Sequence, residues 1–242
     1  MKSYFFLLLI AIATSCQVTE TIQINPDGSG TITTEELRDE NSYMQVAGAN
    51  YSKEEKIKDT TYAFSDVIVK HKETFLKYTK PEQALFATYN NVKVYVKKSS
   101  YDKEFRTTVS QSFKKIEEVP DLYKTEDYAD DLENNYALTA EEHNHRVSYS
   151  FDGSLFKRIV KITDTALLKK KFDEIENLKP GFSKFNNLVQ TYTLKYRFPR
   201  KIKSVSNANT KINEDKKSLT LQFLLTDCLQ NPEITNLEVV LE

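Results

Sequence analysis

The sequence predicts an α+β protein in which an antiparallel sheet, built from hairpins, is packed against several helices. Short segments with alternating apolar and polar residues recur along the chain, and such alternation is typical of half-buried strands. Turn sequences join several of these segments, and Asp152-Gly153 is a strong hairpin turn. The strands do not alternate regularly with helices, as they would in a parallel sheet built from βαβ units.

The first hairpin is predicted close to the N-terminus. Residues 17–24 alternate between polar and β-branched apolar side chains, although Glu20 interrupts the apolar set. Asn25 to Gly30 is dense in turn-forming residues, and the β-branched run 31–34 predicts the returning strand.

A mixed helical and extended region is expected next. Residues 38–59 are polar and predict a loop with a short helix. Ser65 is expected to cap one helix, and Pro81 suits the first turn of another. The alternating segments 92–97 and 105–109 predict a pair of strands.

The middle of the chain combines an acidic region with another hairpin. Residues 114–140 are acidic and compatible with a helix that Pro120 interrupts. The segments 147–151 and 155–162 predict the two strands of the Asp152-Gly153 hairpin.

The clearest helix pattern in the chain follows this hairpin. Asp164 is a good N-cap, the apolar residues from Leu168 onward lie at helical spacing, and Pro180-Gly181 is expected to end the helix. Three strands are predicted after it, around residues 192–198, 219–223 and 237–241.

Composition and charge narrow the class of protein. Hydrophobic residues make up 39% of the 242 residues, charged residues 29%, and the formal net charge is -1, which is a globular balance. A near-neutral chain without a dominant basic block gives no reason to expect a nucleic-acid partner.

The first sixteen residues predict export. A single lysine precedes an apolar run that leads through small residues to Cys16, which is the pattern of a signal peptide. The run is too short for a stable transmembrane helix, which needs roughly 20 apolar residues. We therefore expect a signal peptide over residues 1–15 and a single α+β domain over residues 16–242.

The end of this segment, Ala13-Thr14-Ser15-Cys16, resembles the lipobox of bacterial lipoproteins. The resemblance implies that Cys16 is acylated, with palmitate among its chains, and becomes the first mature residue. Gln17 does not resemble the aspartate that retains such proteins in the inner membrane. The resemblance thus implies a lipid anchor in the bacterial outer membrane, with the periplasmic or surface face left open.

Two further pieces resemble known lipoproteins. The Asp27-Gly28-Ser29-Gly30 hairpin and the segment 196–207, which is followed by the 216–221 strand, are similar to lipoproteins of flavobacteria and their relatives (Bacteroidota), a family without a known activity. More remotely, the hairpin and the Phe198-Pro199 element resemble the LppM-type lipoprotein domain of mycobacteria. That resemblance implies an α/β fold and a lipid-like ligand.

The first hairpin also resembles a calcium-binding loop. Asn25, Asp27, Ser29 and Glu36 occupy the first, third, fifth and twelfth places of an EF-hand loop, with Gly30 at the sixth. An EF-hand needs a helix before the loop, whereas residues 17–24 predict a strand. A plain hairpin is therefore the preferred interpretation, and a calcium-stabilised module through residues 25–36 is the alternative.

No catalytic or cofactor motif is found. The chain lacks a nucleophile elbow, a P-loop and a dinucleotide fingerprint. His143 and His145 could ligate zinc from an extended segment, but no third ligand is evident. Cys228, among leucines, is expected to be a buried apolar group.

The sequence therefore predicts a membrane-anchored envelope lipoprotein, not an enzyme, that acts as a binding or interaction module without a cofactor. Its partners would be the bilayer, through acylated Cys16, and a protein or lipid-like ligand. A carrier of an apolar or lipid-like ligand is the alternative. Ligand identity and oligomeric state do not follow from the sequence.

Overall fold

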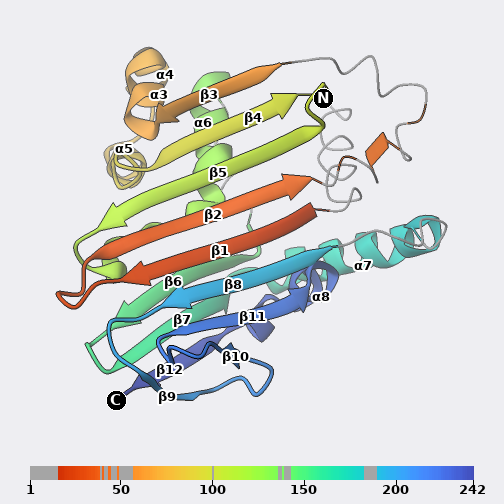
Figure 1. Ribbon diagram of the computed structural model, residues 1–242. Helices are drawn as coiled ribbons and strands as arrows, with labels where there is room; N and C mark the ends of the chain where they lie inside the picture. The colour runs from red at the N-terminus through yellow and green to blue at the C-terminus, as the bar shows by residue number, and fades with distance from the viewer. Residues whose placement is uncertain are drawn as a thin grey trace.

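The computed structural model of the chain describes residues 16–38, 57–99, 101–135, 143–182 and 190–242, together with residues 40, 43, 44, 48 and 138. It confirms the predicted α+β class, with two sheets dominated by antiparallel pairs and several helices (Figure 1). The predicted signal peptide, most of the predicted 38–59 loop and part of the region before His143 lie outside the described residues.

The larger sheet has eight strands. In spatial order they are β10 (Lys211–Ile212), β11 (Ser218–Leu224), β8 (Thr191–Arg197), β1 (Cys16–Ile24), β2 (Gly30–Arg38), β5 (Glu104–Phe113), β4 (Lys93–Ser99) and β3 (Lys58–Ala63). The N-terminal strand β1 is central, because it pairs antiparallel with β2 and parallel with β8. This parallel pair was not predicted from the sequence.

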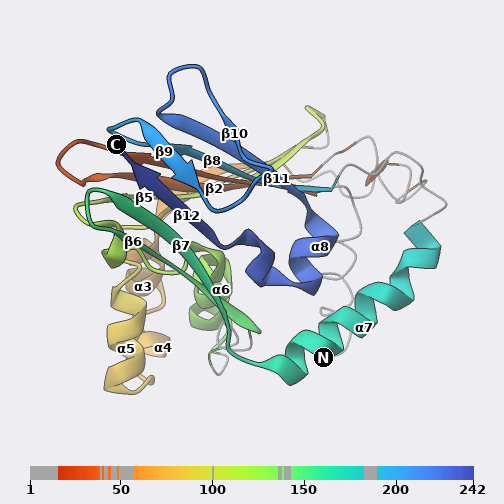
Figure 2. The same ribbon diagram turned by 90° about the horizontal axis from the view of Figure 1, so that it is seen from below.

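A smaller sheet and the helices cover one face of the larger sheet (Figure 2). The smaller sheet has the order β6 (His145–Phe151), β7 (Leu155–Ile162), β12 (Leu237–Leu241) and β9 (Ile202–Val205). The α-helices are α3 (Phe64–Lys70), α4 (Lys72–Phe75), α5 (Lys80–Ala87), α6 (Thr125–Asn134), α7 (Thr165–Phe182) and α8 (Leu225–Gln230), and the 3₁₀ turns are η2 (Ile116–Glu118), η3 (Leu122–Lys124) and η5 (Pro232–Thr235).

The first hairpin forms as predicted, and its glycines explain its tightness. Gly28 has a φ of 83°, and the amide of Asn25 donates to the carbonyl of Ser29 at 2.7 Å. At Gly30, a Cβ would lie 2.1 Å from the carbonyl oxygen of Gln23, so β1 and β2 approach too closely there for any side chain. The turn therefore fixes the register of the strand pair.

Two aromatic groups fill the core beneath the larger sheet. Phe86 on α5 is fully buried, and its ring centroid lies 5.4 Å from that of Tyr128 on α6. Between the two sheets, Phe156 on β7 lies 5.3 Å from both Tyr196 and Phe198, centroid to centroid. All of these side chains belong to one continuous hydrophobic core.

Three local predictions were wrong. The structure begins β3 at Lys58, inside the predicted loop, because its residues complete the edge of the sheet beside β4. Helix α3 begins at Phe64 and not after Ser65, since the Asp66 carboxylate accepts a hydrogen bond from the amide of Ala63 at 2.9 Å. The third concerns α7, which continues through Pro180-Gly181 to Phe182. A proline in the last turn removes one intrahelical hydrogen bond without preventing the turn.

One further helix prediction is confirmed, and three short elements were not predicted. The prediction of Pro81 in the first turn of a helix is confirmed in α5, where the Glu82 carboxylate accepts a hydrogen bond from the amide of Thr79 at 2.7 Å. The short elements β9, β10 and α8 were not predicted. No helix in the described part of the chain is long and apolar enough to span a bilayer.

Candidate functional site

A fully buried ion pair lies between the two sheets. Glu20 on β1 faces Arg158 on β7, and the Arg158 Nη2 atom donates to the Glu20 Oε2 atom at 3.1 Å. The hydroxyl of Tyr123 donates to the same carboxylate at 2.7 Å, and that of Tyr196 also contacts it. Arg158 donates to the Tyr192 hydroxyl at 2.7 Å as well. Glu20, which interrupts the apolar pattern of its strand, is thus the residue that links the two sheets.

The network is electrostatically complete. Burial alone would raise the pKa of Glu20, but the charge of Arg158 and the surrounding hydrogen bonds outweigh it and hold that pKa below its ordinary value. The remaining Arg158 donors reach the hydroxyl of Thr235 at 2.7 Å and its carbonyl at 3.3 Å. With its charges paired and its donors satisfied, this cluster is a structural element.

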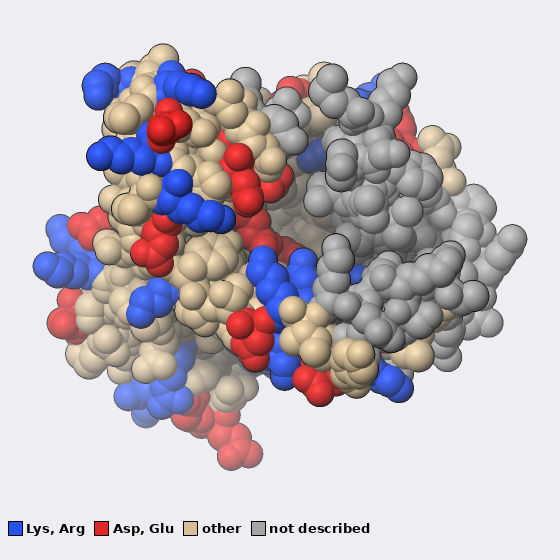
Figure 3. All heavy atoms as spheres, turned by 90° about the horizontal axis from the view of Figure 1, so that it is seen from above, with Lys and Arg blue, Asp and Glu red and all other residues tan. Residues whose placement is uncertain are grey.

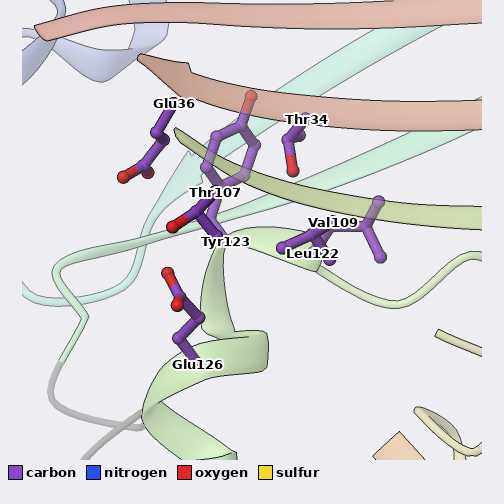
Figure 4. A pocket seen from close by; sticks show the side chains of 7 residues that line it. All are labelled: Thr34, Glu36, Thr107, Val109, Leu122, Tyr123 and Glu126. Atoms are coloured by element: carbon purple, nitrogen blue, oxygen red, sulfur yellow. The ribbon is translucent and has the colours of Figure 1, made fainter. Parts of the chain in front are cut away.

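Next to this network lies a small hollow that we call the acidic hollow. It is lined by Thr34, Glu36, Thr107, Val109, Leu122, Tyr123 and Glu126 (Figure 4). The strand register brings the first residues together, since Glu36 on β2 pairs with Thr107 on β5, and Thr34 pairs with Val109. Turn η3 and the first turn of α6 close the other side. The enclosed volume is about 20 Å³, which suits one water molecule or a small ion.

Two carboxylates from different elements point into this hollow. Figure 4 shows the Glu36 carboxylate descending from β2 toward that of Glu126, which rises from α6. Both residues are exposed to water, although each borders the hollow and is therefore partly surrounded by protein. This partial burial, and then the negative charges of Glu126 and Asp127, raise the pKa of Glu36 to about 7. Burial also raises the pKa of Glu126, against the attraction of Lys98.

Two threonine hydroxyls complete the lining. Thr34 and Thr107 are 5% and 9% exposed, and both residues line the hollow. Both oxygens border the hollow in Figure 4. Two hydroxyls and two carboxylates thus give the hollow a lining rich in oxygen atoms.

The surface around the hollow carries charge of both signs. Figure 3 shows acidic side chains gathered along a hollowed part of the face seen from above. Asp127 on α6 contacts the imidazole of His143. Lys98 on β4 and Lys58 on β3, which pair in the sheet, attract the Glu126 carboxylate.

Of the four residues of the predicted calcium loop, three lie together and Glu36 is separated from them. Asn25, Asp27 and Ser29 lie in the β1–β2 turn, where Ser29 Oγ lies 2.6 Å from Asp27 Oδ1 and accepts from Asn25 Nδ2 at 3.0 Å. Glu36 lies six residues along β2 from Gly30, which is roughly 20 Å in an extended strand. The side chains thus do not surround one point, because residues 31–36 are a strand and not part of a loop.

The other predicted residues are placed as follows. Cys16 is the first residue of β1, and its backbone pairs with that of Arg38. Cys228 on α8 is 8% exposed and unpaired, as predicted, and burial raises the pKa of its thiol to about 12. His143 contacts Asp127 while the ring of His145 contacts the side chain of Asn144. Among the described residues, no three His, Cys, Asp or Glu side chains form a group that could hold a metal ion.

Sequence reasoning missed Glu126, Thr34, Thr107 and Arg158. One signal was available, since Arg158 stands between Phe156 and Val160 at an inward-facing position of its strand. Two opposite charges at inward positions of two strands indicate a buried pair. Nothing in the sequence places Glu126 beside Glu36, because α6 and β2 meet only in the tertiary structure.

The raised pKa of Glu36 predicts a pH-dependent stability. Between the ordinary pKa near 4.5 and about 7, the unfolded chain loses this proton while the folded chain keeps it, so the carboxyl reduces stability as pH rises. We expect Glu36→Gln, which mimics the protonated form, to be more stable than the wild type at pH 8 and to show a smaller loss from pH 4.5 to 7. Because water reaches Glu36, the gain should be about 1 kcal/mol. Urea unfolding at several pH values measures it, and parallel curves for both proteins would contradict the prediction.

Comparisons with known proteins add little to this description. No protein-family model matches the chain, and no curated protein matches its sequence. Among solved structures, the chain is similar to the folded domain of LppM from Mycobacterium tuberculosis, determined by NMR. The two are 9% identical, with a TM-score of 0.39, over 95% of this chain and 90% of that domain. A TM-score this low does not establish a shared fold.

Proposed function

We propose that the chain is a lipoprotein of the bacterial envelope, anchored in the outer membrane by acylated Cys16, and that it binds a ligand without transforming it. We assign the binding site to the acidic hollow, and we propose that the group bound there is positively charged. A single observation carries the binding role: two carboxylates and two threonine hydroxyls from different elements converge on one water-accessible hollow.

The anchor is supported by the sequence before Cys16 and by the position of Cys16 in the sheet. The residue opens β1 and is paired with Arg38, so no flexible linker separates an acyl group there from the folded sheet. An acylated Cys16 would hold the domain directly at the bilayer surface. Several acyl chains exceed the two signals that stable membrane attachment requires.

The anchor is tested on the full chain expressed in a bacterium. We expect the mature protein to begin at Cys16, to carry acyl mass and to enter the detergent phase on partition. Cys16→Ser should remain unprocessed or enter the aqueous phase, whereas Cys228→Ser should behave as the wild type. An unmodified Cys16 in the mature protein would contradict the anchor.

The ligand class follows from the lining atoms. Carboxylate and hydroxyl oxygens are hard ligands and hydrogen-bond acceptors, which suit a divalent cation or an ammonium group. A bound cation would also lower the pKa of Glu36 and remove its destabilising effect.

Thermal unfolding with calcium, magnesium or ethanolamine tests this assignment. We expect one of these probes to raise the melting temperature of the wild type. Glu36→Gln and Glu126→Gln should both lose the effect, whereas Glu214→Gln, an exposed control in the β10–β11 turn, should keep it. No shift with any probe, or an equal shift in all variants, would contradict a cationic ligand in the hollow.

Carriage of an apolar ligand is less well supported. An acyl chain needs an enclosed apolar cavity, whereas the acidic hollow encloses about 20 Å³ and is lined by polar groups. The space between the sheets beside it is occupied by the aromatic side chains of the core.

A further inference from the structure

We infer that the end of the larger sheet at which β1 begins lies against the lipid bilayer, with apolar side chains on both sides of Cys16 entering the headgroup region. The inference rests on the proposed attachment through Cys16 and specifies how the domain is oriented on the membrane. It concerns the ends of β1, β2, β3, β4, β8 and β11, which lie together at one side of Figure 1. We call this surface the anchor end.

Exposed apolar side chains mark the anchor end. Ile57, directly before β3, is 70% exposed, Tyr101 in the β4–β5 turn is 69% exposed, and Leu224 at the end of β11 is 59% exposed. Leu224 pairs with Thr191, which in turn pairs with Gln17, so Leu224 lies at the same level of the sheet as Cys16.

These side chains flank the anchor point. β11 is two strands from β1 on one side, and β3 is four strands away on the other. At the usual strand spacing, six intervals span roughly 30 Å. Contacts on both sides of a single covalent anchor would stop the domain from pivoting about it.

Cationic side chains also lie at the anchor end. The Arg38 guanidinium lies 3.8 Å from the centroid of the Phe105 ring, and the Lys98 ammonium lies 4.3 Å from it. Lys98 pairs in the sheet with Lys58, the first residue of β3. Arg38 is also paired with Glu40, and Lys98 and Lys58 attract Glu126, whereas Lys103 in the β4–β5 turn is exposed and is a cation that complements lipid phosphates.

The combination of residue types fits a membrane interface. Tyrosine places its ring among headgroups with its hydroxyl in water, and lysine extends its ammonium along apolar surface toward phosphate. Scattered exposed apolar residues are ordinary on a protein surface. The three at the anchor end differ because they share one end of one sheet with the proposed acylation site.

The absence of tryptophan from the chain permits a direct test. Tyr101→Trp and Leu224→Trp each introduce a single fluorophore at the anchor end. Leu76→Trp introduces one at a control site, because Leu76 follows α4 and is 58% exposed. The acylated proteins are reconstituted into vesicles of phosphatidylethanolamine and phosphatidylglycerol, with or without bromine on the acyl chains.

We expect brominated lipid to quench Tyr101→Trp and Leu224→Trp at least twofold more than Leu76→Trp. Equal quenching at the three positions, or none in vesicle-bound protein, would overturn the orientation while leaving the anchor intact. Failure of the wild type to acquire acyl chains would instead refute the attachment proposed above, and the two results are therefore distinguishable.

Discussion

Arg158→Ala is expected to lower the free energy of unfolding by about 3–5 kcal/mol, because it leaves the Glu20 carboxylate buried without its counter-ion. The hydroxyls of Tyr123 and Tyr196 would still donate to Glu20, but they cannot neutralise its charge. Urea denaturation followed by circular dichroism measures the change. Lys157→Ala is the matched control, since Lys157 precedes Arg158 on β7 and forms an exposed pair with Glu238 at 2.7 Å. That control should lose about 1 kcal/mol or less.

A double variant separates charge from shape. Replacing both members, as Glu20→Gln with Arg158→Met, removes the unpaired charge while keeping most of the volume. It should recover part of the stability that Arg158→Ala loses, because a buried ion pair replaced as a pair is often close to neutral. If Arg158→Ala were no more damaging than Lys157→Ala, the ion pair would not hold the sheets together as the structure indicates.

Phe86→Ala should have an effect of similar size in the other part of the core. Phe86 is fully buried. Its ring contacts the rings of Phe64, Phe75, Tyr78 and Tyr128. Truncating such a side chain removes apolar contact and leaves a cavity, at a typical cost of about 3–5 kcal/mol. The same denaturation measurement tests it.

Phe172→Ala is the control for this substitution. Phe172 lies on α7 and is 39% exposed, so the same chemical change removes much less buried surface. Phe86→Leu should fall between the two, because leucine fills part of the space. Equal losses for Phe86→Ala and Phe172→Ala would contradict the central place of Phe86 in the helical part of the core.

Much of the fold could be predicted from the sequence, because hairpins are local. The turns at Gly28 and Gly153 need positive φ, and the strands beside them alternate clearly. Pairings between distant segments could not be predicted in this way. The parallel β1–β8 pair and the approach of Glu126 on α6 to Glu36 on β2 depend on contacts that no local pattern records.

The candidate site shows the same division. The sequence singled out Glu36 as the last residue of a loop motif, and the structure places it in the acidic hollow with a different set of neighbours. Motif spacing assumes a loop that brings its ends together, whereas residues 31–36 are extended. The partners of Glu36 come from β5 and α6, and their approach is a product of tertiary packing.

The central position of β1 has a consequence for biogenesis. An exported chain crosses the membrane with its N-terminus first, so β1 would arrive beside the bilayer long before β8, its parallel neighbour, has been translocated. The hairpin of β1 and β2 can form early, but the β1 edge that β8 covers would stay open until the C-terminal part follows. Such long-range closure is slow, and open strand edges attract other chains. Under the proposed export, the maturing protein would therefore depend on protection of that edge until β8, which begins at Thr191 of the 242-residue chain, has crossed.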